Sequence, residues 1–119
     1  MLPAPARMRR GAEFSSTVRR GSRGTSRAVT VHLAAPEPAG ATDTSPRVGF
    51  VVARAVGPAV ARNRVRRRLR HLLRDRLTSL PAASSVVVRA HPAAAGLPSP
   101  ALAADLDRAL EQALLRGRT

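Results

Sequence analysis

The chain has 119 residues, enough for one small domain, and its 21 basic residues outweigh 7 acidic residues to give a net charge of +14. All of the basic residues are arginine, and cysteine, tryptophan and tyrosine are absent. These counts exclude a disulfide scaffold, a thiolate metal site and a cysteine nucleophile. No apolar run reaches the roughly 18 residues of a membrane span. The first ten residues lack the apolar stretch of a secretory signal, so we expect a cytoplasmic protein.

The excess of positive charge indicates the class of partner. A compact domain with a net charge of +14 repels itself, and this cost is tolerated where a polyanion neutralises the charge. Nucleic acid is therefore the leading partner class, and an anionic membrane surface is the lesser alternative.

The first part of the chain predicts a short helix after an extended start. Residues 1–8 are rich in proline and are expected to be extended. The spacing over residues 9–20 predicts a helix, because Phe14 and Val18 are four residues apart and share one face.

Two strands are predicted next, separated by a loop. Apolar and polar residues alternate over residues 27–34, which predicts a half-buried strand. The more continuous apolar run over residues 47–55 predicts a strand that is more deeply buried. Between them, residues 35–46 are rich in proline, glycine and small polar residues, and we expect them to form a mobile loop.

The second half of the chain predicts two helices around a third strand. Pro58 suits the first turn of a helix that we expect over residues 58–78. The apolar stripe of this helix consists of Val65, Leu69, Leu72, Leu73 and Leu77. A strand over residues 84–90 follows, and Ser99 is expected to be the N-cap of the last helix. Together these elements predict an α+β sandwich, a single domain over residues 1–119 with helices packed on one small sheet.

The helix over residues 58–78 carries the strongest chemical signal. Its segment 61–70 reads ARNRVRRRLR, and seven of these ten residues are arginine or asparagine. At about 100° of rotation per residue, Arg64, Arg67 and Arg68 are expected to cover the face opposite the apolar stripe. Arginine binds phosphate through a planar fork of donors and also stacks on bases. A solvated charged face is the alternative interpretation, although such faces usually mix charges of both signs.

Candidate catalytic groups are scattered along the sequence. A two-metal nuclease needs clustered carboxylates, and a general acid–base nuclease usually needs placed histidines. The seven acidic residues and three histidines of this chain supply neither arrangement. No histidine has a partner at the spacing of metal ligands. We therefore expect a binding subunit that has no catalytic residue and no metal site of its own.

The segment 47–70, RVGFVVARAVGPAVARNRVRRRLR, resembles the signature of the bacterial ribonuclease P protein subunit. In that family a strand and a short turn precede a helix that carries an arginine-asparagine-arginine element. Residues 62–64 of this chain match that element. The opening of the chain is also similar, with a basic stretch, an acidic residue before Phe14 and a basic pair before Gly21. The resemblance covers nearly the whole chain.

The resemblance implies a fold, of the order α-β-β-β-α-β-α with a left-handed β-α-β crossover. The strand that the hydrophobic pattern does not show would lie between Arg27 and Ala55.

A role is implied as well. The protein would be a subunit of the endoribonuclease ribonuclease P, whose catalytic RNA, with Mg²⁺ bound mainly by that RNA, removes the 5′ leader of precursor tRNA. Its partners would be the catalytic RNA and precursor tRNA, with no membrane involved, and a weak homodimer is left open. The alternative is a structural RNA-binding protein of ribosomal or nucleoid type.

Individual residues take roles from the same resemblance. The residues that would contact the catalytic RNA are Arg62, Asn63, Arg64, Arg66, Arg67, Arg68 and Arg70. The cleft for the single-stranded leader would be lined by Phe14, Val18 and His32. The family commonly has aromatic residues where Val18 and His32 stand, and base stacking on such rings is worth about 1–3 kcal/mol per base. Leader contacts in this chain are therefore expected to depend more on arginines, with Arg27 and Arg54 as candidates.

Overall fold

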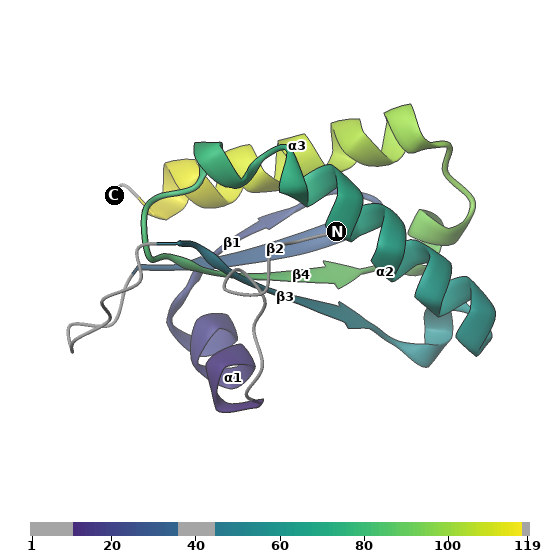
Figure 1. The fold of residues 1–119 in the computed structure, drawn as a ribbon, viewed down its shortest axis with the longest axis horizontal. Coiled ribbons are helices and arrows are strands. Elements are labelled where there is room, and N and C mark those ends of the chain that lie inside the picture. Colours follow the sequence, from purple (N-terminus) through teal and green to yellow (C-terminus); the bar gives the residue numbers. More distant parts are fainter. Residues whose placement is uncertain (1–10, 36–44, 118–119) are drawn as a thin grey trace.

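The computed structural model describes residues 11–35 and 45–117 and shows an α+β sandwich (Figure 1). Its main elements are α1 (Gly11–Arg20), β1 (Ser22–Thr25), β2 (Val29–Ala34), β3 (Arg47–Val52), α2 (Ala59–Arg74), β4 (Ser85–Ala90) and α3 (Ser99–Gly117). Three short 3-10 segments, η2 (Arg54–Val56), η3 (Leu77–Ser79) and η4 (Pro92–Ala95), lie between them. The order α-β-β-β-α-β-α that the resemblance implies is confirmed. The predicted extended segment and most of the predicted loop lie outside the described residues.

The four strands form one mixed sheet in the order β1-β2-β4-β3. β2 is antiparallel to both of its neighbours, whereas β3 and β4 are parallel. α2 connects these two parallel strands and therefore forms the crossover of the fold. In Figure 1, α2 and α3 cover one face of the sheet and α1 lies on the other. Because successive side chains of a strand point to opposite faces, each strand contributes to both sides.

The main core lies between the sheet and the two helices α2 and α3. Its largest fully buried side chains are Val29, Val31, Val48, Val65, Leu69, Leu73, Val86, Val88, Leu102 and Leu106. The predicted stripe of α2 is confirmed in Val65, Leu69 and Leu73, while Leu72 and Leu77 are partly buried beside them. Burying one such side chain is worth roughly 1.5–3 kcal/mol. Packing therefore holds the arginine-rich helix in a fixed rotation on the sheet.

The fourth strand is not where the resemblance placed it. It is β1, which precedes residue 27, so the expected position between residues 27 and 55 is wrong. The hydrophobic pattern does not show this strand because SRGT is short and has no apolar alternation. Its central residue, Gly24, faces α3 so closely that a Cβ atom there would overlap the carbonyl oxygen of Ala109. Only glycine permits this approach of two backbones.

Side chains of α3 also satisfy the outer edge of β1. The Oε1 atom of Gln112 accepts a hydrogen bond from the backbone N–H of Thr25 at 3.2 Å. Arg116 donates a hydrogen bond to the carbonyl oxygen of Arg23 at 2.6 Å. These bonds occupy backbone groups that an edge strand otherwise leaves open to another chain.

Two helix ends differ from the sequence prediction. Pro58 is the N-cap of α2 and not part of its first turn, and the helix ends at Arg74 and not at residue 78. The chain turns there and continues into η3. α3 includes Ser99 in its first turn, so Ser99 is not the N-cap. The carbonyl oxygen of Pro98 instead accepts the first hydrogen bonds of that helix.

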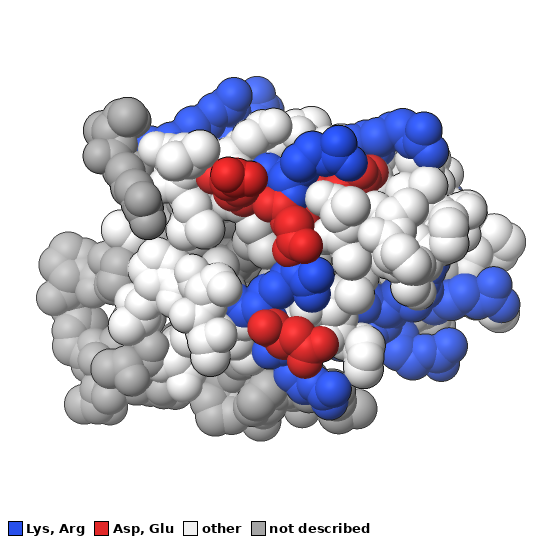
Figure 2. Space-filling view, turned by 90° about the horizontal axis from the view of Figure 1, so that it is seen from above, with Lys and Arg blue, Asp and Glu red and all other residues white. Residues whose placement is uncertain are grey.

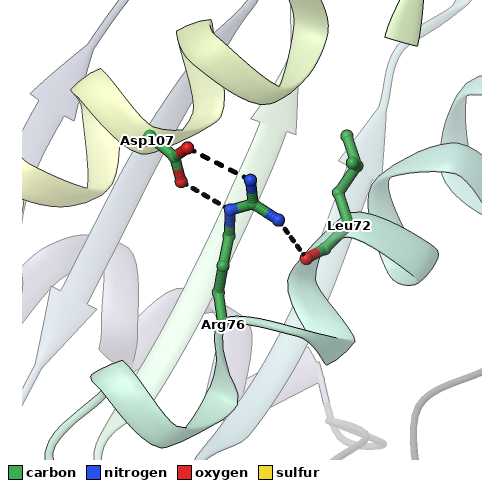
Figure 3. A network of polar contacts seen from close by, with 3 residues as sticks. All are labelled: Leu72, Arg76 and Asp107. Atoms are coloured by element: carbon green, nitrogen blue, oxygen red, sulfur yellow. Dashed lines mark hydrogen bonds and ion pairs between the residues drawn. The ribbon is translucent and has the colours of Figure 1, made fainter. Parts of the chain in front are cut away.

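Arg76 connects the end of α2 to α3 (Figure 3). Its guanidinium donates two hydrogen bonds to the carboxylate of Asp107, at 2.5 Å and 3.1 Å, and a third to the carbonyl oxygen of Leu72 at 2.7 Å. The hydrogen bond to Asp107 raises the pKa of Arg76, and partial burial opposes that rise. This bidentate ion pair links the turn after α2 to α3 and helps to hold the two helices together.

Replacing Gly24 by alanine should lower the free energy of unfolding by about 1–3 kcal/mol, because the new Cβ atom meets the backbone of α3. Urea unfolding followed by circular dichroism measures this loss. Gly96→Ala is the matched control, since nothing lies within 4 Å of a Cβ atom there. Its effect should stay below about 0.5 kcal/mol. Equal stability of Gly24→Ala and the wild type would contradict the close contact between β1 and α3.

Candidate nucleic-acid interface

The outer face of α2 is a row of exposed polar side chains. With Val65, Leu69 and Leu73 buried against the sheet, the opposite side of the helix faces solvent. The exposed predicted residues on this side are Asn63, Arg64 and Arg67. Arg62, Arg66, Arg68 and Arg70 are only partly exposed. The seven predicted RNA contacts therefore fall into an outer group and a flanking group.

Arg68 belongs to the flank that faces η4 and the start of α3. Its guanidinium donates hydrogen bonds to the carbonyl oxygens of Ala94, at 3.4 Å, and Leu97, at 2.5 Å. A further hydrogen bond at 3.4 Å reaches the hydroxyl of Ser99. Arg68 therefore does not lie on the outer face beside Arg64 and Arg67, as the helical spacing led us to expect. It ties α2 to the segment that precedes α3.

Arg70 occupies the other flank, above the edge strand β3. Its guanidinium carbon lies 5.9 Å from the ring centroid of Phe50, which is within the range of a cation–π contact. Arg66 lies one turn earlier on the same side and donates a hydrogen bond to the side chain of Asn63 at 3.1 Å. Arg62 donates to the carbonyl oxygen of Gly57 at 3.2 Å, which closes the turn before the helix. These contacts orient the guanidinium groups on this flank.

The acidic side chains that the structure describes gather on one side of the molecule. Those that the structure describes are Asp75, Asp105, Asp107 and Glu111, from the end of α2 and from α3. Figure 2 looks onto this side and shows the carboxylates close together among arginines. Because carboxylates repel a polyanion, this side is the least suited to nucleic acid. The outer face of α2 and the α1 side of the sheet remain as candidate surfaces for nucleic acid.

A groove of about 430 Å³ lies where α1 meets the sheet. Its lining residues are Phe14, Ser15, Val18, Arg19, Val51 and Arg89. The structure thus brings together Phe14 and Val18, two of the residues predicted for the leader cleft. β3 and β4 supply the floor, and Arg19 and Arg89 add positive charge beside the apolar surface.

His32 lies on the same side of the sheet and is buried. It is on β2, one of the two strands against which α1 packs. Register places Arg23 of β1 opposite His32, and Val87 of β4 on its other side. Burial, followed by the charges of Arg89 and Arg23, lowers the pKa of His32. The imidazole is therefore neutral at pH 7.

The two arginines predicted for the leader cleft lie elsewhere. Arg27 is in the turn between β1 and β2 and lines a separate pocket of about 580 Å³ with Leu97 and Arg108. The structure therefore does not bring Arg27 into the groove with Phe14. Arg54 is exposed in η2, which leads from β3 to α2.

Arg19 of α1 and two strand arginines on the α1 side, Arg23 and Arg89, escaped the sequence analysis. Arg89 falls on the groove side because strand alternation places Val86 and Val88 in the core. That alternation was a usable signal for Arg89. No such signal existed for Arg23, because its strand has no apolar pattern and its partner is known only from the strand register.

The described residues offer groups that bind phosphates and stack on bases. Among residues 11–35 and 45–117, no three histidine, cysteine or acidic side chains come together as a metal site would need. Within the same two segments, no helix combines the length and the apolar character needed to cross a membrane. Arginine and phenylalanine side chains line the groove, and the imidazole of His32 lies on the same face of the sheet.

Comparisons of sequence place the chain among known proteins. The family model described as Ribonuclease P matches residues 2–114. A relative from Streptomyces griseus, named ribonuclease P protein component, is 50% identical over 118 residues that cover 96% of each chain. A relative of the same name from a Nocardioides species is 51% identical over 116 residues, covering 98% of this chain and 94% of its own.

Solved structures share the fold. The RNase P protein of Staphylococcus aureus superposes with a TM-score of 0.76 at 22% identity, covering 89% of this chain and 93% of its own. The RNase P protein of Thermotoga maritima gives a TM-score of 0.70 at 20% identity, covering 84% and 90%. The family match spans nearly the whole sequence and includes both α1 and the arginine helix α2. The chain therefore belongs to the family of ribonuclease P protein components.

Proposed function

We propose that the chain binds the catalytic RNA of ribonuclease P through the outer face of α2 and holds the 5′ leader of precursor tRNA in the groove beside α1. Membership of the family makes the chain a protein subunit of this tRNA-processing endoribonuclease. The observation that carries the finer assignment is the separation of charge. The described carboxylates lie on the α3 side, whereas Arg64 and Arg67 on α2 and Arg19 and Arg89 at the groove have no acidic partner among the described residues.

The outer face of α2 suits the backbone of a folded RNA. Arg64 and Arg67 are exposed, and neither makes a hydrogen bond or ion pair with the described residues. Arginines placed in this way displace counterions from RNA, and binding then weakens steeply as salt rises. Arg66 and Arg70 extend the same positive surface toward β3. Contacts to phosphates position a protein on RNA without reading its sequence.

The groove beside α1 suits a single strand. Phe14 offers one ring on which a base can stack, and Arg19 and Arg89 offer guanidinium groups for the phosphates. Arg54 follows β3, the strand that supplies Val51 to the groove, and precedes α2. A leader in the groove would therefore leave it close to the RNA-binding helix. This arrangement gives precursor tRNA an attachment that mature tRNA lacks.

We assign the chemistry to the RNA subunit and its bound Mg²⁺. The described residues contain no cluster of the carboxylates that a two-metal nuclease needs. The arginines would instead reduce the repulsion between the catalytic RNA and precursor tRNA. The complex should therefore need less Mg²⁺ than the RNA alone. We place this reaction in the cytoplasm, as expected from the sequence.

Cleavage of a 5′-labelled precursor tRNA at low Mg²⁺ tests this division of labour. The reaction is run with the protein alone, with a bacterial ribonuclease P RNA alone, and with both together. We expect a cut at the mature 5′ end only when both are present. Cleavage by the protein alone would contradict the assignment of the chemistry to RNA. Lack of stimulation, with salt-sensitive RNA binding retained, would favour a purely structural RNA-binding role.

The double variant Arg64→Gln/Arg67→Gln tests the outer face of α2. It should bind the catalytic RNA more weakly, and the slope of log K against log salt should fall by roughly 0.7–0.9 for each phosphate that the protein no longer neutralises. Its free energy of unfolding should not change, because both side chains are exposed. Filter binding at several salt concentrations, with urea unfolding in parallel, measures both quantities.

Two single variants serve as comparisons for this experiment. Arg68→Gln should lower the free energy of unfolding by about 1 kcal/mol or more, because it removes the bonds to Ala94 and Leu97. Arg108→Gln removes one positive charge from the α3 side and should leave the salt slope unchanged. Wild-type affinity and slope in the double variant would show that this face does not contact the RNA.

A further inference from the structure

Three nitrogen-bearing side chains stand close together on the α1 side of the sheet. Arg23 of β1 is directly opposite His32 of β2. Arg89 of β4 is opposite Thr30, two residues from His32 along β2. With strands about 4.8 Å apart, the Cα atoms of these three residues lie within about 12 Å of one another. Two arginine side chains are long enough to meet above the imidazole between them.

Packing on the other side of the sheet fixes the direction in which these side chains point. Gly24 faces α3, so its neighbour Arg23 points to the α1 side. His32 lies between two core residues of β2, and Arg89 follows a core residue of β4, so both point the same way. Arg89 also lines the groove together with Phe14 and Val18. The three side chains therefore share the face of the sheet on which the groove lies. Arg89 lines the groove itself, and His32 and Arg23 lie beyond it on β2 and β1.

None of these three side chains is bound by another described residue. Among the described residues, the side chains of Arg23, His32 and Arg89 make no hydrogen bond or ion pair. Arg68 and Arg76, by contrast, are bound to backbone and carboxylate oxygens. The ring nitrogens of His32 have no hydrogen-bond partner among the described residues, yet they are not fully buried. They are therefore accessible from the surface. A strand that extends from the groove across β2 can therefore reach all three.

The charged groups that the structure describes around His32 are cations. β1 contributes Arg23, β4 contributes Arg89, and α1 contributes Arg19 at the groove, while the side chain of Glu13 lies outside the described residues. Burial and the two strand arginines lower the pKa of His32. His91 is engaged elsewhere, with its Nε2 atom 2.7 Å from the hydroxyl of Thr30. A protonated His32 thus lacks a described counterion, and an anion would supply one.

We propose that Arg23, His32 and Arg89 form a phosphodiester site on the α1 face of the sheet, beside the groove, in which binding of one leader phosphate is coupled to protonation of His32. The proposal rests on the assignment of the groove to the leader. The two guanidiniums hold the phosphate, and the imidazolium donates a hydrogen bond to one of its oxygens. The proton comes from the solvent, and no covalent bond forms or breaks. The chain thus uses charge where the family commonly has an aromatic ring.

Leader binding should therefore strengthen as the pH falls. In the free protein the pKa of His32 lies below its usual value of 6.5, and a bound phosphate raises it. At a pH above the pKa of both the free and the bound protein, the imidazole is neutral in both states, and pH does not change the affinity for the leader. At a pH between the two pKa values, binding takes up a proton and the affinity rises as the pH falls. At a pH below both pKa values, the affinity levels off. Each unit by which binding raises the pKa gives about a tenfold gain in affinity.

The test uses the assembled complex of protein and catalytic RNA. Dissociation constants are measured for precursor tRNA with a five-nucleotide leader and for mature tRNA, from pH 5.5 to pH 8 at constant ionic strength. Their ratio isolates the leader contribution and should rise about tenfold toward pH 5.5. His32→Phe should keep a leader preference and lose its pH dependence. Arg23→Gln and Arg89→Gln should reduce the preference, whereas Arg108→Gln, on the α3 side, should match the wild type.

A ratio that is independent of pH in the wild type, or equally dependent in His32→Phe, would overturn the proton-linked site. No leader preference at any pH would instead overturn the proposed function of the groove. Nuclear magnetic resonance titration of His32 in the wild-type protein provides a measurement that needs no variant. A five-nucleotide single-stranded RNA with hydroxyl ends should raise the pKa of His32. An unchanged pKa with this RNA bound would overturn the site.

Discussion

The burial of one valine and two leucines determines which arginines of α2 face solvent. Val65, Leu69 and Leu73 pack against the sheet and fix the rotation of α2. Because the helix cannot turn about its axis, Arg64 and Arg67 face solvent. The same rotation puts Arg68 and Arg70 on the two flanks, where they contact the segment before α3 and the ring of Phe50. Without this packing, the basic helix would have no defined face.

The contact between β1 and α3 determines what lies on the far side of the sheet. Gly24 admits the backbone of α3, and Gln112 and Arg116 of that helix bind the edge of the strand. With β1 held in this orientation, Arg23 must project toward α1, next to His32. A packing constraint in the core thus places a cation on the face of the sheet where single-stranded RNA is expected.

The described acidic side chains stabilise the fold on the α3 side, and among the described residues the charges on the groove side are positive. Asp107 binds Arg76, and Asp105 binds Arg108 and accepts a hydrogen bond from the backbone N–H of Ala28 at 3.1 Å. These pairs lie on the side of α3, where they hold helices and a turn in place. The groove side retains its arginines for a ligand. The distribution therefore gives the protein a definite orientation toward RNA.

Local hydrophobic periodicity was enough to predict the elements that have a clear apolar face. These were both long helices, three of the four strands and the outward direction of Arg64 and Arg67, because spacing along a helix or strand fixes its faces. The position of β1, the tie between Arg68 and Leu97, and the place of Arg27 on the α3 side emerged only from the folded chain. Folding also brought Arg23, His32 and Arg89 together. Strand register and helix docking depend on contacts between residues that are distant in the chain. Local periodicity cannot predict them, because it reflects only the spacing of residues within one helix or strand.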